Sequence, residues 1–124
     1  MAAKAEQIIA DFLDCWHRRD LEGLVARVTQ DVAFQPDPGA EMVRGREAVG
    51  ALWAQYLETM LGYEADIRQL AAGQGVVFVE RVERLSLSGG RRMELPIVGV
   101  FELDPAGQIR AWRDYWDPAM AKPV

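Results

Sequence analysis

The stretch GVVFVERVERLSLSGGRRMELPIVGVFEL, residues 75–103, carries the clearest secondary-structure pattern of this chain. Apolar and polar side chains alternate on both sides of its SGG segment, which is typical of two long strands joined by a hairpin. We therefore expect strands over residues 75–87 and 91–103. A shorter strand is expected before them, at 63–71, and a last strand follows the DPAG turn, at 108–116.

The first half of the chain has the period of a helix instead. Residues 3–18 carry apolar side chains at helical spacing, and a similar stripe begins after Gly45. Between them, Asp20 can cap a short helix over 21–28, and a strand at 32–35 leads into a loop rich in proline and glycine. Helices followed by an antiparallel meander predict an α+β fold, with the helices on one face of a curved sheet and a cavity inside the resulting cone.

Composition argues against several classes of function. The 124 residues suit a single domain over 1–124, and half of them are apolar, which is enough for a buried core. The net charge of −5 opposes binding to nucleic acid or to an anionic membrane. A single cysteine, Cys15, cannot form an internal disulfide, and a single histidine, His17, argues against a metal site. We expect neither a secretory signal nor a membrane helix, and therefore a cytoplasmic location.

The last predicted strand carries charged residues among its aromatic ones. Strand alternation puts Asp114 on the same face as Trp112 and Trp116. If the two tryptophans face the helices, the carboxylate of Asp114 is buried with them. Because burying an unpaired charge is costly, Asp114 then needs a partner.

Arg81 and Glu83 are the candidate partners of Asp114. They share one face of the strand over 75–87, but both faces of that strand are mixed, so periodicity alone does not choose the buried one. A buried arginine can bond both carboxylates, and two carboxylates in different surroundings can act as general acid and general base. The alternative is that all three residues are exposed strand charges, which is the usual state of such side chains.

Four segments of the chain resemble the NTF2-like superfamily, and within it the limonene-1,2-epoxide hydrolase family. They are VRGREAV (43–49), ERVERL (80–85), LPIVGVFEL (95–103) and GQIRAWRDYWD (107–117). The superfamily also includes ketosteroid isomerase and the SnoaL-like polyketide cyclases. The resemblance implies a cystatin-like α+β cone, in which N-terminal helices pack on a curved, mixed but mostly antiparallel sheet around a pocket. It also implies a homodimer that forms through the outer face of the sheet.

The resemblance assigns roles to Arg81, Glu83 and Asp114, which we call the trio. Members of the family open an epoxide in one step with two aspartates and an arginine: one carboxylic acid protonates the epoxide oxygen, and the other carboxylate deprotonates the attacking water. Arg81 matches the arginine and Asp114 matches the base. Glu83 stands where the family usually has its acidic aspartate. The implied activity needs no cofactor, and its substrate is a small apolar epoxide.

Two positions depart from the family pattern. The family holds its water with a tyrosine and an asparagine two residues apart on the first strand. Phe34 and Pro36 stand at those positions here, and neither side chain can form a hydrogen bond. Either another group has replaced these anchors, or the pocket does not activate water in the manner of the family.

Two other functions remain open. The segment FQPDPG places Asp37 before a proline, which resembles the general base of the ketosteroid isomerases and suggests a cofactor-free isomerase or cyclase. The tyrosine and aspartate of that enzyme's oxyanion hole correspond to Phe12 and Gly99, so its electrophile is missing, and Asp-Pro is also common turn chemistry. A third hypothesis is a non-catalytic pocket that binds a hydrophobic small molecule.

We expect the pocket to receive a small apolar organic molecule and to have walls of aromatic and aliphatic side chains. The expected lining consists of Phe12, Trp16, Phe34, Trp53, Val79, Leu85, Ile97, Trp112 and Trp116. Three methionines, Met42, Met60 and Met93, are further candidates. All of these residues would also suit an ordinary hydrophobic core.

Overall fold

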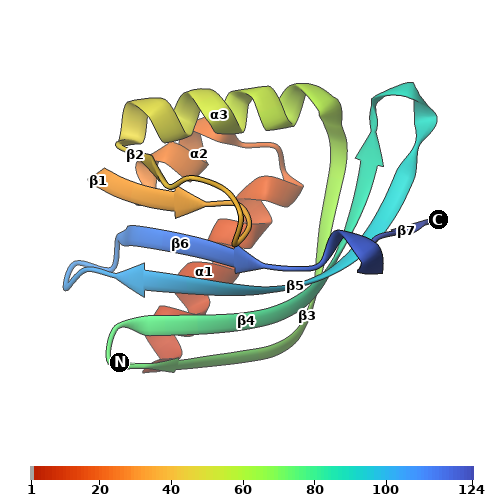
Figure 1. Ribbon diagram of the computed structural model, residues 1–124. Coiled ribbons are helices and arrows are strands. Elements are labelled where there is room, and N and C mark those ends of the chain that lie inside the picture. Colours follow the sequence, from red (N-terminus) through yellow and green to blue (C-terminus); the bar gives the residue numbers. More distant parts are fainter. Residues whose placement is uncertain (1) are drawn as a thin grey trace.

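A computed structural model describes residues 2–124 of the protein, and Figure 1 shows how they are arranged. Over these residues, three α-helices lie on one side of a strongly curved sheet. The helices are α1 (Ala2–His17), α2 (Leu21–Ala26) and α3 (Arg46–Thr59). In the part of the chain that is described, no helix combines the length and apolar character that crossing a membrane requires.

Within residues 2–124, the strands form one seven-stranded sheet with the order β2-β1-β6-β5-β4-β3, and β7 pairs with β5. The strands are β1 (Val28–Gln35), β2 (Val43–Arg44), β3 (Met60–Gly73), β4 (Val76–Leu87), β5 (Arg92–Leu103), β6 (Ile109–Tyr115) and β7 (Lys122–Pro123). The strands β3 to β6 form the expected antiparallel meander. The sheet as a whole is mixed, because β1 runs parallel to β6.

The position of β1 corrects two expectations from the sequence. The short helix expected over 21–28 ends at Ala26. The strand expected over 32–35 already begins at Val28, as β1. Val28 is almost fully buried and is aligned with Ile109 of β6. The residue therefore belongs to the sheet because of a pairing with a segment far away in the sequence, which local periodicity cannot report.

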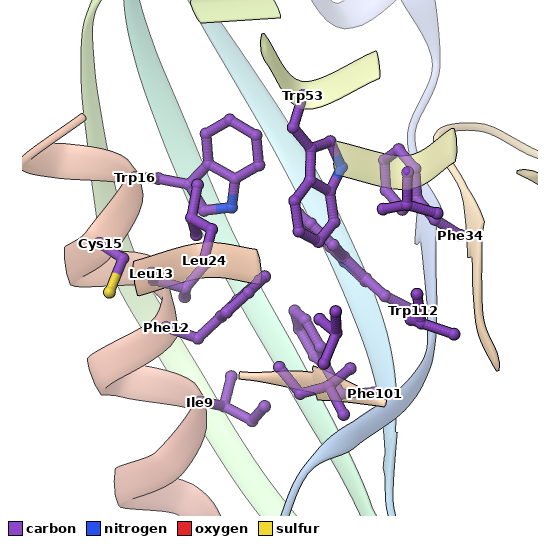
Figure 2. Packing of buried hydrophobic residues seen from close by; sticks show 14 of the residues in the cluster. Ile9, Phe12, Leu13, Cys15, Trp16, Leu24, Phe34, Trp53, Phe101 and Trp112 are labelled. Carbon is purple, nitrogen blue, oxygen red and sulfur yellow. The ribbon is translucent and has the colours of Figure 1, made fainter. Parts of the chain in front are cut away.

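A cluster of aromatic rings fills the space between α1 and the concave face of the sheet (Figure 2). The Trp112 ring is central: its centroid lies 5.3 Å from that of Phe12, 5.0 Å from that of Phe101 and 4.8 Å from that of Phe34. Trp53 from α3 packs edge-on against Phe12 at 5.8 Å. This core fills part of the cone, and the cavity described below lies beside it.

Candidate functional site

Three charged side chains are buried on the concave face of the sheet. Arg81 is fully buried, and Glu83 and Asp114 are each 8% exposed. Nη2 of Arg81 donates to Oε2 of Glu83 at 2.8 Å and to Oδ2 of Asp114 at 3.0 Å. The alternative of three exposed strand charges is therefore wrong. An arginine between two carboxylates satisfies both with charge-assisted hydrogen bonds, as such a burial requires.

The sheet brings these residues together across an intervening strand. Arg81 and Glu83 lie on β4 and Asp114 lies on β6, with β5 between them. The residue of β5 opposite Asp114 is Gly99, and a Cβ atom at Gly99 would lie 2.9 Å from Nη1 of Arg81 and 2.9 Å from Oδ1 of Asp114. The guanidinium therefore reaches across β5 at a position where only a glycine leaves room for it.

Two neutral donors complete the hydrogen bonding of the carboxylates. The Tyr63 hydroxyl donates to Oε2 of Glu83 at 2.6 Å, and the indole Nε1 of Trp112 donates to Oδ1 of Asp114 at 2.8 Å. Nε of Arg81 donates to the same Glu83 oxygen at 3.1 Å. All three donors to Glu83 thus converge on Oε2 and leave the lone pairs of Oε1 for a ligand.

The surroundings change the acidity of the trio. Burial raises the pKa of Asp114, Arg81 opposes this rise, and the charge of Glu83 adds to it, with a net pKa of about 6. Burial also raises the pKa of Tyr63 well above its usual value, and the neighbouring Glu83 raises it further, so the phenol remains a donor. Burial alone would lower the pKa of Arg81, but the two carboxylates reverse this effect, and the guanidinium stays charged.

A cavity of about 360 Å³ lies beside the trio. The Glu83 and Asp114 side chains form part of its wall, whereas Arg81 is buried behind them. Several of the side chains expected from the sequence line it, namely Trp16, Phe34, Leu85, Ile97, Trp112 and Trp116. Met60 and Met93 also do so. A cavity of this size with apolar walls and two carboxylates suits a small apolar molecule that reacts at one polar group.

Three of the expected lining residues lie elsewhere. Phe12, Trp53 and Val79 belong to the buried core, with at most 1% of each side chain exposed. Phe12 and Trp53 are covered by other aromatic rings, as Figure 2 shows. Met42 also lies outside the cavity wall. Core and cavity residues have the same hydrophobic character, so only the packing separates them.

The cavity wall also contains three side chains that the sequence pattern does not single out, namely Tyr56, Tyr63 and Leu95. Tyr56 lies in the apolar stripe of α3 and resembles a core residue. The sequence pattern predicts a strand at Tyr63, but its bond to Glu83 depends on the register of β3 and β4, in which Tyr63 is opposite Leu85. The one available signal was a hydroxyl within each of two otherwise apolar patterns, since a buried tyrosine hydroxyl usually finds a polar partner.

Asp37 lies in the loop between β1 and β2, where it also forms part of the cavity wall. Its Oδ1 accepts the backbone N–H of Gly39 at 2.9 Å, so the residue does form the turn that its sequence suggests. Nε1 of Trp116 donates to the Pro36 carbonyl at 2.8 Å and ties this loop to the chain after β6. Nε2 of Gln35 is bonded to the Ala40 carbonyl at 2.9 Å and does not face the trio as a free donor.

In the described part of the chain, no three His, Cys, Asp or Glu side chains are grouped in a way that could hold a metal ion. The trio itself offers acid–base chemistry. Two carboxylates, bridged by one arginine and exposed to one apolar cavity, can give a proton to one atom of a ligand and take a proton from another.

Comparison with known proteins shows which family the chain resembles over most of its length. A family model described as the limonene-1,2-epoxide hydrolase catalytic domain matches residues 3–121. None of the curated proteins compared with the chain matches it.

Two solved structures are similar to this chain. An LEH-like epoxide hydrolase from M. tuberculosis is 27% identical, with a TM-score of 0.85, and the match covers 96% of this chain and 86% of that one. The epoxide hydrolase/cyclase-like enzyme SalBIII, which has a role in pyran ring formation in the polyether salinomycin, is 20% identical, with a TM-score of 0.90 and coverage of 98% and 97%. These matches confirm the NTF2-like α+β fold that the sequence predicts.

Proposed function

Because this chain belongs to the limonene-1,2-epoxide hydrolase family, we propose that it opens the epoxide ring of a small apolar molecule by acid–base catalysis. The observation that carries the proposal is the bridge of Arg81: one guanidinium nitrogen bonds Glu83 and Asp114 at 2.8 and 3.0 Å, and both acids border the same cavity. The 27% identical LEH-like epoxide hydrolase supports it.

The roles follow the family pattern. Asp114 in its ionised form takes a proton from the attacking oxygen nucleophile. That oxygen forms a bond to an epoxide carbon, the C–O bond at this carbon breaks, and Glu83 gives its proton to the epoxide oxygen. Arg81 holds both side chains and keeps its charge throughout. With water as the nucleophile the product is a diol, and no cofactor is needed because protons are the only species that the protein supplies.

A second candidate is the opening of an epoxide by a hydroxyl of the same molecule, which forms a cyclic ether. Phe34 and Pro36 favour it, because both border the cavity and neither can hold a water molecule. A tethered hydroxyl needs less help to stay near the reacting carbon than a free water does. The isomerase hypothesis has less support, since Phe12 is buried in the core and Gly99 has no side chain to donate a hydrogen bond.

The test is to incubate the protein with a panel of cyclic and terpenoid epoxides, some of which carry a free hydroxyl, and to identify the products by mass spectrometry. Asp114→Asn and Glu83→Gln should each lower turnover by roughly 10²- to 10⁴-fold, the usual contribution of a general acid or base. Glu80→Gln is the matched control, because Glu80 lies on the same strand but is exposed. Its turnover should equal that of the wild type.

The outcomes separate the hypotheses. Diols mean hydrolysis, and cyclic ethers formed only from the hydroxy-epoxides mean cyclisation. Turnover that survives Asp114→Asn contradicts the proposal in both forms. Binding of the epoxides without any turnover supports the non-catalytic pocket, and solvent deuterium exchange into a ketone that is lost in Asp37→Asn supports the isomerase.

A further inference from the structure

The cavity contains few neutral groups that could hold a nucleophile next to Asp114. The indole nitrogens of Trp112 and Trp116 and the hydroxyl of Tyr63 are each committed to a protein acceptor. Nε1 of Trp16 has no partner, but this nitrogen is buried within the packed aromatic rings.

Among the described residues that border the cavity, Tyr56 carries the remaining hydroxyl. The hydrogen bonds within residues 2–124 include none of this hydroxyl, and the side chain is only partly buried, so the group can meet a ligand. Its protonation also suits a donor: burial and the charges of Asp37 and Asp114 raise the pKa of Tyr56 above its usual value. The phenol is therefore neutral at physiological pH, and it can both donate and accept a hydrogen bond.

The place of Tyr56 is informative. Its ring packs at an angle of 70° against the ring of Phe34, with 6.4 Å between the centroids. Phe34 occupies the strand position at which the family resemblance calls for a water-holding tyrosine. A phenol has thus been lost from β1, and another reaches the same cavity from α3, against the ring that replaced the first.

We propose that the Tyr56 hydroxyl holds the attacking water of this enzyme for deprotonation by Asp114, in place of the anchors lost at Phe34 and Pro36. This inference rests on the proposed epoxide-opening function. The Tyr56 hydroxyl either donates a hydrogen bond to the water or accepts one from it, and it exchanges no proton with the substrate. The proton of the water goes to Asp114, the oxygen bonds to the epoxide carbon, and the released epoxide oxygen takes its proton from Glu83.

The experiment compares Tyr56→Phe with the wild type on a substrate that carries both an epoxide and a hydroxyl. Such a molecule can give a diol with water or a cyclic ether by itself. Loss of the anchor should lower kcat for diol formation by roughly 10- to 100-fold and change KM by less than about 3-fold. The ratio of cyclic ether to diol should rise, because the tethered hydroxyl does not depend on an anchor. Glu58→Gln, at an exposed position of the same helix, is the control and should change neither value.

A second variant tests the geometry directly. Adding Phe34→Tyr to Tyr56→Phe returns a phenol to the strand beside the same cavity, and we expect it to restore diol formation at least in part. A purely structural role of Tyr56 would lower both products equally and would not be rescued in this way.

The results distinguish the two proposals. If the wild type forms diol and Asp114→Asn does not, but Tyr56→Phe retains the wild-type kcat and product ratio, the inference is wrong while the proposed function stands. If the wild type opens none of the epoxides, both are overturned.

Discussion

The hydroxyl of Tyr63 donates a 2.6 Å hydrogen bond to Oε2 of Glu83, and this bond connects β3 to the buried trio of β4 and β6. Glu83 is one methylene longer than the aspartate that usually stands at this position in the family. Tyr63 and Arg81 converge on the same oxygen of the longer side chain. The extra donor fixes the direction of the carboxyl group, so the second oxygen can face the ligand.

Removal of this donor should therefore affect both stability and activity. We expect Tyr63→Phe to lower the free energy of unfolding by about 1–3 kcal/mol, since it leaves a buried carboxyl oxygen with one donor fewer. Turnover should fall as well, because the proton of Glu83 is no longer aimed at one position. Urea unfolding and steady-state kinetics measure the two effects. Wild-type stability in Tyr63→Phe would contradict the structural role assigned to this bond.

The acidity of Asp114 predicts how activity depends on pH. With a pKa of about 6, the side chain loses its ability to accept a proton as the pH is lowered through this value. We expect kcat/KM of the free enzyme to decline below about pH 6. A profile that stays flat from pH 8 to pH 5 would exclude Asp114 as the base.

The same pKa predicts how stability depends on pH. The carboxyl group has an ordinary pKa of 3.8 in the unfolded chain and about 6 in the folded one, so the folded state binds more protons between these values. The contribution of Asp114 is therefore favourable below about pH 4 and is lost as the pH rises through about 6. Asp114→Asn should remove this slope from the free energy of unfolding. Urea titrations of both proteins at pH 4, 5, 6 and 7 provide the measurement.

Gly99 should be intolerant of even a methyl group. A Cβ atom there would approach both Nη1 of Arg81 and Oδ1 of Asp114 to 2.9 Å, so Gly99→Ala should separate the pair. We expect a loss of about 1–3 kcal/mol in stability and a large loss of turnover. Gly73→Ala is the control, because a Cβ at Gly73 meets nothing within 4 Å. Equal effects of the two substitutions would show that the space at Gly99 is not special.

The outer face of the sheet predicts a homodimer. Phe78, Val98 and Tyr115 are between 39% and 51% exposed, and they come from the adjacent strands β4, β5 and β6. Neighbouring exposed apolar groups of this kind usually mark an interaction surface. Light scattering at micromolar concentration should give twice the chain mass of 13.9 kDa, and Phe78→Glu should reduce it to the single mass. A wild-type protein with the mass of one chain would refute the dimer.

Features that depend on neighbouring residues were readable from the sequence. The alternation along 75–103 predicted the long hairpin, and the helical stripe after Gly45 predicted α3. The resemblance of four segments to the epoxide hydrolase family was sufficient to identify it, and the match over residues 3–121 confirms this. Alternation also placed Asp114 on the same face as Trp112, which the structure bears out because both side chains are buried.

Features that depend on pairing between distant segments of the chain could not be read from the sequence. Both faces of β4 are mixed, so the burial of Arg81 was decided only when β5 and β6 supplied Gly99 and Asp114 beside it.

Local pattern was therefore enough for the strands β3 to β6 and for the helices α1 and α3, because periodicity and turn chemistry are local properties of the chain, and the resemblance of four segments supplied the family and the roles of the candidate trio. Tertiary structure alone decided that Tyr63 bonds Glu83, that Tyr56 borders the cavity and that Phe12 does not. The physical reason is that a hydroxyl or an aromatic ring has the same local pattern in a core and in a cavity wall. Which of the two it joins depends on strand register and on how completely the helices fill the curved sheet.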